Sequence, residues 1–534
     1  MAIEIFYDRV ELPSETLTYD TSEFDTSDAN WDSYPFPHLV RTGISAPLGV
    51  HTVTLTNADA EVTFALDFGG RLWSYRLRKS DEWIIAPPQS IQLTPGGPRG
   101  VQLAHGVELF AGTAPRLQSL SPIEHRLLEP SDDGEPASIL FHELQPGLGV
   151  STHARWTLND AGADLELDVR TVRRGLTAGQ PGDEGLIFWN RGPNGFAVSA
   201  TGLWEDAGGR WTRPLPRQPR QTSSYSVRLR PFAGLGERRF FGASAALGLG
   251  SNEVQVAGLD SVGPAKLLLQ LPDGQVMEAP LDIQPASTAR FGLDGLPATP
   301  THFEVRASTG ETIVSNIPIA PETPGQADRL LMDAGTRHLG HLTQAKGLDS
   351  EAALAEVEDA LLYAGDDALT WVQKALLETR LDQPEAAQQS ELNAHFLAPM
   401  EPLLRSVALM RQTEGDLSLL SALKDHPEAL VDGACQLLES GLRPEAARWL
   451  QAAISARPQP MLYLLLAWAH LEDGRTIEAA ALVQQAELPL EQPLPWREIE
   501  LEALTALAQK FPISPGLQGR KSLVERYRAA IART

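Results

Sequence analysis

The chain has 534 residues, of which 42% are hydrophobic and 21% are charged, and its formal net charge at pH 7 is −25. One hydrophobic core cannot fill this length, so we expect about two to four domains. The acidic balance argues against a nucleic-acid partner, because a phosphate backbone requires a basic face on the protein that binds it. A neutral sugar or polyol is compatible with that charge, which also helps to keep a large protein in solution.

The cysteine content and the apolar runs of the sequence indicate the cellular compartment in which the protein is expected. The single cysteine, Cys435, cannot form an internal disulfide, and its amphipathic helical surroundings predict a buried thiol rather than a nucleophile. Acidic residues come early in the stretch 1–8, which argues against a signal peptide. The longest apolar run, 461–469, is too short to span a bilayer. We therefore expect a cytoplasmic protein that binds neither membranes nor nucleic acid.

Residues 1–45 are acidic and aromatic and have no periodic apolar face. A segment without such a face cannot build a core of its own. We therefore predict that it wraps over a neighbouring domain and uses aromatic side chains such as Trp31 and Tyr34 as anchors.

Alternation of apolar and polar residues dominates residues 46–251. Runs such as 61–66 and 164–169 follow a period of two. The turn at 159–163 is expected to join two strands as a hairpin. Many strands at such intervals, without intervening helices, are typical of a large antiparallel sandwich.

A second, smaller β unit is predicted over residues 252–320. Asp-Gly at 273–274 and Thr-Gly at 309–310 each stand between two strand-like runs. Paired strands of this kind are typical of an immunoglobulin-like module. The Pro-rich stretch 318–324 follows as a stiff linker.

The C-terminal part, 326–534, follows helical spacing. The heptapeptide that begins at Gly441 is echoed from Gly474, and the shift of 474 − 441 = 33 residues is the length of a two-helix unit. These glycines are expected to end the first helix of each unit in a left-handed conformation. A similar pair begins at Pro384 and Pro444, where the shift of 444 − 384 = 60 residues indicates an earlier copy of different length. We predict tetratricopeptide-like repeats here, with a generic helical array as the alternative.

The densest set of candidate site residues lies between 67 and 112. A Gly-Gly pair precedes Arg71, so the backbone permits a tight turn from which the guanidinium projects. His105 and Glu108 are three positions apart and face opposite sides of a strand unless Gly106 introduces a bulge. Arg71, His105 and Glu108 could hold the hydroxyl groups or ring oxygen of a sugar. Alternatively, Arg71 and Glu108 form a buried pair and His105 is an ordinary loop residue.

Two further clusters carry polar or aromatic groups. His142, Glu143 and His153 are residue types that bind metals, but the helical spacing of zinc motifs is absent. We therefore favour a sheet surface and predict neither a metal ligand nor a cofactor. Trp189 and Asn190 could offer an indole face and an amide to a sugar ring, although tryptophan is also common in sandwich cores.

Signatures of several enzyme classes are missing from the sequence. It contains no Gly-x-Ser-x-Gly nucleophile motif and no glycine-rich phosphate loop. Glycoside hydrolysis needs two carboxyl groups at a defined separation, which a sequence alone does not specify. Whether the chain is an enzyme is left open, with Glu108 as the candidate catalytic carboxylate.

The order of these parts resembles a bacterial family known as domain of unknown function 5107, whose β domain is similar to galactose mutarotase. The resemblance rests on Phe68-Gly-Gly-Arg-Leu-Trp73, on Gly106-Val-Glu-Leu-Phe110 and on the succession of sandwich, small β unit and repeats. It implies a sugar cleft to which Arg71 and Glu108 contribute. Phe110 stands where the family has Asn, and the sandwich reads as shortened, which indicates a divergent and degenerate member.

We therefore expect a carbohydrate-recognising or carbohydrate-processing protein with a cleft in the sandwich and an interaction surface on the repeats. Arg71, His105, Trp189 and Asn190 would contact the saccharide, and an active protein would resemble a glycoside hydrolase or a sugar epimerase. The alternative is a non-enzymatic scaffold that binds a protein partner through the repeats. The sugar, the reaction and the formation of a homo-oligomer are left open.

Overall fold

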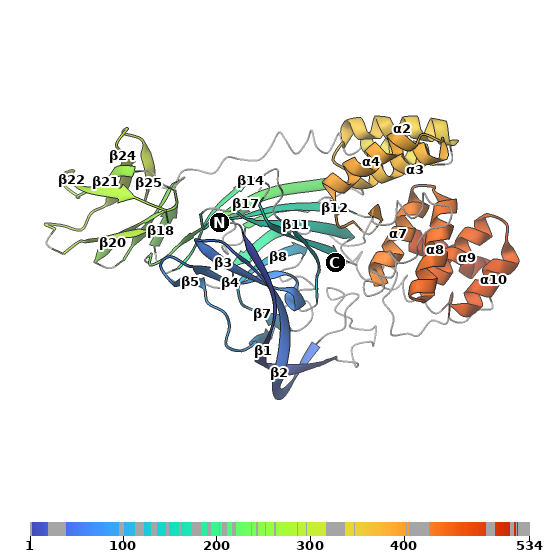
Figure 1. Ribbon diagram of the computed structural model, residues 1–534, viewed down its shortest axis with the longest axis horizontal. Coiled ribbons are helices and arrows are strands. Elements are labelled where there is room, and N and C mark those ends of the chain that lie inside the picture. Colours follow the sequence, from blue (N-terminus) through green and yellow to red (C-terminus); the bar gives the residue numbers. More distant parts are fainter. Residues whose placement is uncertain are drawn as a thin grey trace.

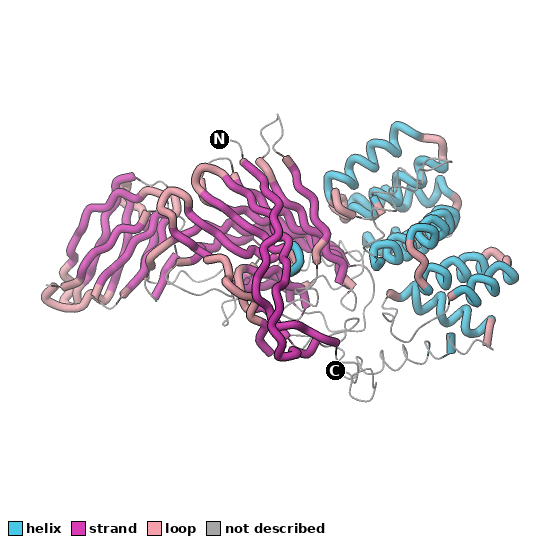
Figure 2. The backbone as a smooth tube through the Cα atoms, turned by 60° about the horizontal axis from the view of Figure 1, so that its bottom comes forward, coloured by secondary structure: helices cyan, strands magenta, loops and turns pink. Residues whose placement is uncertain are grey.

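In a computed structural model, a β-rich N-terminal region is followed by a C-terminal helical region (Figure 1). A large β-sandwich lies in the middle, with a smaller β unit at one end and the helices at the other (Figures 1 and 2). The predicted order of β parts followed by helical repeats is confirmed. The structure describes residues 3–19, 39–95, 101–112, 122–129, 136–145, 149–159, 162–173, 183–188, 194–201, 203–205, 211–215, 221–235, 238–241, 244–250, 252–260, 263–285, 287–294, 296–316, 337–346, 348–401, 403–404, 427–486, 497–512, 517–518 and 521.

Two antiparallel sheets form the sandwich. The nine-stranded sheet has the order β1-β2-β3-β4-β8-β13-β16-β15, with β5 paired to β4, and the six-stranded sheet has the order β14-β17-β12-β11-β10-β9. The strands of the first are β1 (Glu4–Tyr19), β2 (Leu39–Thr56), β3 (Ala60–Ala65), β4 (Arg71–Leu77), β5 (Glu82–Ile85), β8 (Val107–Gly112), β13 (Asp183–Phe188), β15 (Trp204–Glu205) and β16 (Trp211–Pro214). Those of the second are β9 (Glu124–Leu128), β10 (Ser138–Gln145), β11 (Val150–Leu158), β12 (Leu165–Arg173), β14 (Gly195–Thr201) and β17 (Thr222–Phe232).

The core of the sandwich lies between these two sheets. Successive side chains of a strand point to opposite faces, so each strand gives every second residue to the core. Phe64 from the first sheet meets Phe141 and Trp156 from the second, with ring centroids 5.7 and 5.5 Å apart. This aromatic contact joins the two layers, as the alternating pattern predicts.

The N-terminal segment differs from the wrapping segment expected over 1–45. Residues 4–19 form the strand β1, which pairs with β2 along a long hairpin (Figure 2). Much of the hairpin meets solvent on both faces, so no apolar period of two marks it in the sequence. Phe6 and Tyr7 are each more than half exposed, and the Tyr7 ring contacts that of His125 with centroids 6.0 Å apart. Trp31 and Tyr34 lie outside the described residues.

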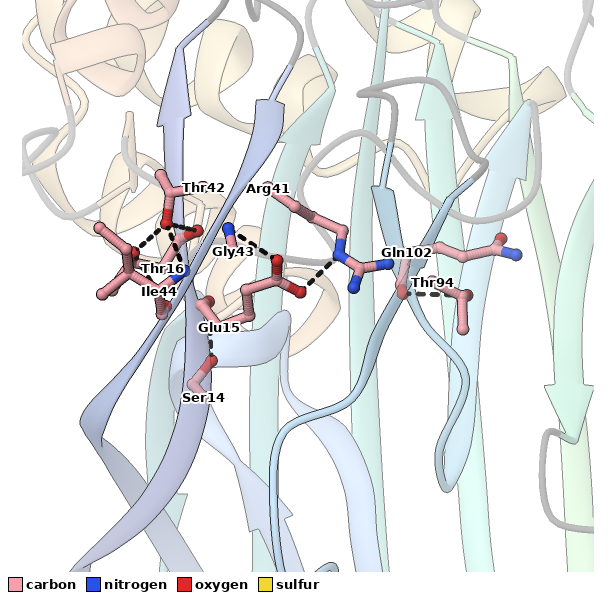
Figure 3. Close-up of polar contacts among 9 residues, drawn as sticks. All are labelled: Ser14, Glu15, Thr16, Arg41, Thr42, Gly43, Ile44, Thr94 and Gln102. Atoms are coloured by element: carbon pink, nitrogen blue, oxygen red, sulfur yellow. Dashed lines mark hydrogen bonds and ion pairs between the residues drawn. The ribbon is translucent and has the colours of Figure 1, made fainter.

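Side-chain hydrogen bonds hold an irregularity in this hairpin (Figure 3). The pairing register of β1 and β2 shifts just after Glu15. The hydroxyl of Thr16 meets that of Thr42 across the two strands. The carboxylate of Glu15 accepts hydrogen bonds from Arg41 Nε at 2.5 Å and from the Gly43 N–H at 2.9 Å. These bonds satisfy backbone and side-chain groups that the regular ladder leaves out.

Two four-stranded sheets form the smaller β unit around one shared core. One has the order β18-β19-β20-β23 and the other β22-β21-β24-β25. Their bounds are β18 (Arg238–Phe241), β19 (Ala245–Leu249), β20 (Glu253–Gly258), β21 (Gly263–Gln270), β22 (Val276–Ile283), β23 (Thr288–Gly292), β24 (His302–Ala307) and β25 (Thr312–Ser315).

This unit begins earlier than the expected residue 252. Strands β18 and β19 pair with each other and with β20, so residues from 238 onward belong to the smaller unit. The strand pattern is the same on both sides of this border, and only 233–237 separate β17 from β18. No change in composition therefore marks the boundary. The turn at 273–274 is confirmed, since Gly274 has φ 87 between β21 and β22.

The helical region contains the predicted 33-residue repeat. The helices with described bounds are α2 (Ser350–Tyr363), α3 (Ala368–Arg380), α4 (Pro384–Leu397), α7 (Pro427–Glu439), α8 (Arg443–Ala456), α9 (Pro460–Glu472), α10 (Thr476–Gln485) and α11 (Glu498–Lys510). The starts of α7 and α9 differ by 460 − 427 = 33 residues, and those of α8 and α10 by 476 − 443 = 33. Gly441 and Gly474 have φ 74 and 77, the left-handed helix ends that the glycines predict.

Two sequence expectations concern single elements of this region. Cys435 is buried on α7, and burial raises the pKa of its thiol well above the ordinary value, which agrees with the inert core thiol predicted. Within the residues that the structure describes, no helix combines the length and the apolar character needed to cross a membrane.

The turn between α3 and α4 predicts a stabilising substitution. Asp382 has φ 56 there, in the left-handed region that Gly441 and Gly474 occupy at the corresponding turns. A residue with a Cβ atom is strained in this region by about 1 kcal/mol. We expect Asp382→Gly to raise the free energy of unfolding by about 0.5 kcal/mol, because part of the relief is offset by greater freedom of the unfolded chain. Urea denaturation measures the change.

Gly474→Ala is the matched control for that substitution. No atom lies within 4 Å of the Cβ that alanine would add at this position. The variant should therefore lose about 1 kcal/mol through backbone strain alone. A loss of stability in Asp382→Gly would contradict this account of the turn.

Candidate functional site

Arg71 and Glu108, the two residues at the centre of the predicted cleft, do meet. Arg71 Nη2 lies 2.6 Å from Glu108 Oε2. Arg71 Nη1 donates to the carbonyl oxygen of His105 at 2.7 Å and also to that of Leu103. Arg71 is 1% exposed and Glu108 is 0% exposed. The two groups form an enclosed ion pair, which is the second of the two interpretations that the sequence allowed.

The pair lies on the face of the nine-stranded sheet that points away from the six-stranded sheet. Val107 and Leu109, which flank Glu108 on β8, belong to the core between the sheets. Because neighbouring side chains alternate, Glu108 points to the opposite face. That face is covered by a short hairpin of β6 (Leu93–Pro95) and β7 (Val101–Leu103), whose Leu93 and Leu103 pack with Trp73. Arg71 therefore fastens this hairpin to the sheet.

The backbone just after β7 explains how this contact forms. Gly106 has φ 74, and a Cβ atom at this position would lie only 2.0 Å from the carbonyl oxygen of Leu72. Only glycine fits this conformation and this close approach. The left-handed residue ends the strict alternation before β8, as the sequence allowed, and turns the carbonyl of His105 toward Arg71.

His105 is a partly buried structural residue in this arrangement. Its Nε2 lies 2.8 Å from the carbonyl oxygen of Trp73 and therefore carries the proton, because a carbonyl only accepts. Its ring meets the Trp73 indole edge to face, with centroids 5.3 Å apart. Burial lowers the pKa of His105, against the opposing effect of the hydrogen bond to Trp73. The imidazole is thus neutral at pH 7. Trp189 and Asn190 lie outside the described residues.

The two histidines that were predicted to lie on a sheet surface form a second cluster. His142 on β10 and His153 on β11 are directly opposite each other, and their ring centroids are 4.6 Å apart. Glu124 on β9 stands opposite His142, and its Oε2 lies 3.1 Å from His142 Nδ1. Glu143 points to the other face of β10. All four side chains are buried rather than solvated.

This cluster also contacts the helical region. Glu401, which follows α4, places Oε2 at 3.6 Å from His153 Nε2. Arg170, opposite His153 on β12, donates to the carbonyl oxygen of Leu397 at 3.2 Å. The sequence contains no signal for these contacts, because they join residues far apart in the chain that belong to different folding patterns.

A third polar set lies inside the sandwich. Thr152, Thr171 and Ser223 are cross-strand neighbours on β11, β12 and β17 and face the core. From the opposite sheet, the buried Glu184 accepts a hydrogen bond from Ser223. Burial raises the pKa of Glu184 to about 7, although hydrogen bonds and the charge of Arg213 at 3.7 Å act in the opposite direction. Glu184 was not among the predicted site residues, because a single glutamate in an alternating strand has no feature that distinguishes it in the sequence.

Glu184 makes the stability of the protein depend on pH. Its pKa in the folded state, about 7, lies above the ordinary value of 4.5, so the fold favours the protonated carboxyl. The free energy of unfolding therefore falls as pH rises from about 4.5 to 7, by about 3 kcal/mol for this group. The difference in free energy of unfolding between Glu184→Gln and the unchanged protein should therefore shift in favour of the variant by about 3 kcal/mol from pH 5 to pH 8. Urea denaturation at both pH values measures the difference, and an equal difference at the two would contradict the assignment.

Comparisons with known proteins identify no family for the chain. No protein-family model matches the sequence, and no curated protein matches it. Among solved structures, a TPR-domain containing protein from Parabacteroides distasonis is 12% identical, with 96% of each chain covered and a TM-score of 0.31. PilW, a type IV pilus biogenesis factor, is 20% identical over 35% of this chain and 97% of its own, with a TM-score of 0.18. A polysaccharide lyase is 10% identical over 89% of this chain and 82% of its own, also with a TM-score of 0.18. At these identities and TM-scores, the likenesses carry no argument about function.

Proposed function

We propose that this chain is a non-enzymatic interaction protein, which binds a protein partner through its helical repeats and uses its β part as a scaffold. The enclosure of Arg71 and Glu108 carries this proposal. A sugar cleft would need both side chains in the open, whereas they are buried against each other and Arg71 also binds backbone carbonyls. These interactions support a structural role for both residues in the sheet.

The order of the parts supports a place among divergent members of the domain of unknown function 5107 family. The motif residues 68–73 and 106–110 that carry the resemblance serve the fold: they supply a turn, a left-handed glycine and a buried ion pair. A member that has kept these residues for folding and lost the cleft would retain a mutarotase-like scaffold without sugar chemistry. Saccharide recognition is then the function that the test has to exclude.

Helix α4 offers a surface for a protein partner. Leu392 and Phe396 are four residues apart and therefore share one face of the helix. They are 55% and 87% exposed. Large apolar side chains that remain exposed together mark contact sites for other proteins. Because the chain carries a net charge of −25 and α4 adds Glu385 and Glu391, we infer an apolar partner segment flanked by basic residues.

A capture experiment with the full chain tests the proposal. The double substitution Leu392→Glu with Phe396→Glu should abolish binding of a partner that the unchanged protein retains, and the purified partner should bind with an affinity that falls with ionic strength. Val276→Glu is the matched control, because Val276 is also exposed and apolar but lies on β22 of the smaller β unit. This control should bind normally.

Two results would contradict the proposal. One is a partner that binds the double variant as well as it binds the unchanged protein, since the repeats would then not be the contact. The other is a rise in melting temperature or a heat of binding with a mono- or oligosaccharide. Such a result would restore the carbohydrate hypothesis and move the search to Trp189 and Asn190.

A further inference from the structure

We propose that His142, His153 and Glu401 bind a zinc ion that fastens the helical region to the six-stranded sheet. One ligand atom from each residue lies within 4.8 Å of those of the other two, and all three residues are buried. Two imidazoles and a carboxylate are a ligand set that zinc uses in proteins. This inference goes beyond the interaction function, which requires no metal.

The donor atoms are close enough for one ion to bind all three after small side-chain movements. Zinc ligands at about 2.0–2.1 Å from the metal stand about 3.3 Å from one another. Nε2 of His153 lies 3.6 Å from Glu401 Oε2. Ser151 Oγ lies 3.0 Å from His142 Nε2 and 3.4 Å from His153 Nε2, so this hydroxyl stands beside both imidazole donors and is a candidate fourth ligand. A neutral hydroxyl is a weak zinc ligand, and a water molecule can take the same place.

The surroundings prepare His142 to act as a ligand. Its Nδ1 lies 3.1 Å from Glu124 Oε2, so Nδ1 carries the proton and Nε2 presents its lone pair. A carboxylate behind a histidine in this way fixes the tautomer and the orientation of the ring, as in many zinc sites. The charges also balance, because Glu401 in the ligand set and Glu124 behind it together offset the two positive charges of the ion.

The three ligands come from separate parts of the chain. His142 and His153 belong to β10 and β11 of the sandwich, whereas Glu401 follows α4. Figure 1 shows β11 and β12 extending toward the helical region. The hydrogen bond from Arg170 on β12 to the carbonyl oxygen of Leu397 is a second link between the same two parts. Binding of the metal ion at this place is therefore coupled to the docking of the helices on the sheet.

Metal binding by the untagged full-length chain tests the proposal. The protein is stripped with a chelator, titrated with Zn²⁺ in a calorimeter and assayed for bound zinc by mass spectrometry. We expect one zinc ion per chain and a melting temperature that rises with zinc. His153→Asn and Glu401→Gln should each weaken zinc binding by at least about 100-fold. Glu124→Gln, which acts behind a ligand, should weaken it by about 10- to 100-fold.

Two control variants separate this site from adventitious binding. His341→Ala removes another His–Glu contact, of 2.8 Å to Glu356 in the helical region, and should leave the stoichiometry and affinity unchanged. Ser151→Ala should retain zinc, since water replaces a weak ligand. Mg²⁺ should not compete, because imidazole donors favour zinc.

Two outcomes would overturn the proposal. The first is a stripped protein that takes up no zinc. The second is zinc uptake that Glu401→Gln and His153→Asn leave unchanged, because the ion would then bind elsewhere. Far-ultraviolet circular dichroism establishes that each variant is folded, and Glu401→Gln, which keeps the size of the side chain, decides the matter if His153→Asn unfolds.

Discussion

Glu108→Gln is expected to lower the free energy of unfolding by about 3–5 kcal/mol, because it leaves the buried guanidinium of Arg71 without its counter-charge. Glutamine keeps the shape of the side chain, so the loss reports on charge rather than on packing. Urea denaturation of the purified variant measures it. A catalytic carboxylate in an open cleft behaves differently: its amide loses activity and leaves stability nearly unchanged.

An exposed ion pair provides the control for this substitution. Glu278 lies 2.7 Å from Lys266 on the smaller β unit, and both side chains are more than half exposed. Glu278→Gln should change the free energy of unfolding by less than about 0.5 kcal/mol. Equal changes in the free energy of unfolding at Glu108 and Glu278 would show that the buried Arg71–Glu108 pair stabilises the fold no more than an exposed pair does.

Gly106→Ala is expected to be more damaging than its size indicates, with a loss of about 3 kcal/mol or more. The added Cβ atom would lie 2.0 Å from the carbonyl oxygen of Leu72, so the backbone of β4 or β8 must move. The left-handed conformation at φ 74 adds a further penalty of about 1 kcal/mol. Because Gly106 also orients the carbonyl that Arg71 binds, we expect the β6–β7 hairpin to loosen, which hydrogen exchange detects as faster exchange at Leu103.

Gly162→Ala separates the two causes within the same sandwich. Gly162 has φ 91, and no atom lies within 4 Å of an added Cβ. This variant should lose only the conformational penalty, about 1 kcal/mol. If Gly106→Ala costs no more than Gly162→Ala, the close approach to Leu72 does not constrain the sheet.

The helical repeats were the most predictable part of the chain. Gly441 and Gly474 end helices at the same place in two successive units, and this local requirement appears directly as a 33-residue shift. The border near residue 238 was not predictable, because strands on its two sides obey the same alternation. The hairpin of β1 and β2 was not predicted for a related reason. A strand that meets solvent on both faces shows no alternation of apolar and polar residues in the sequence.

The sequence predicted which residues meet at the candidate site but not whether they are open to solvent or buried. The sequence brought Arg71 and Glu108 together through motifs, yet the same two residues suit an open cleft and a closed pair. Their burial depends on the β6–β7 hairpin. Its strands have only three residues each, which is too short to produce a recognisable pattern in the sequence. Glu401 could not be predicted from the sequence, because its contact with His153 depends on how the helical region docks on the sheet.

The edge strand β1 has a consequence for assembly. Among the described strands it ends the nine-stranded sheet. Its outer side is paired locally at Pro13, whose carbonyl oxygen accepts a hydrogen bond from the Ile91 N–H at 2.9 Å, and no other described strand pairs along that side. Such an edge can recruit a strand from another molecule and start a fibril. Here the exposed side chains of Glu4, Asp8, Arg9 and Glu11 place charges along it, and the excess of negative charge repels a second copy. Concentrated solutions should therefore resist edge-to-edge aggregation at low salt and lose that protection when the charges are screened.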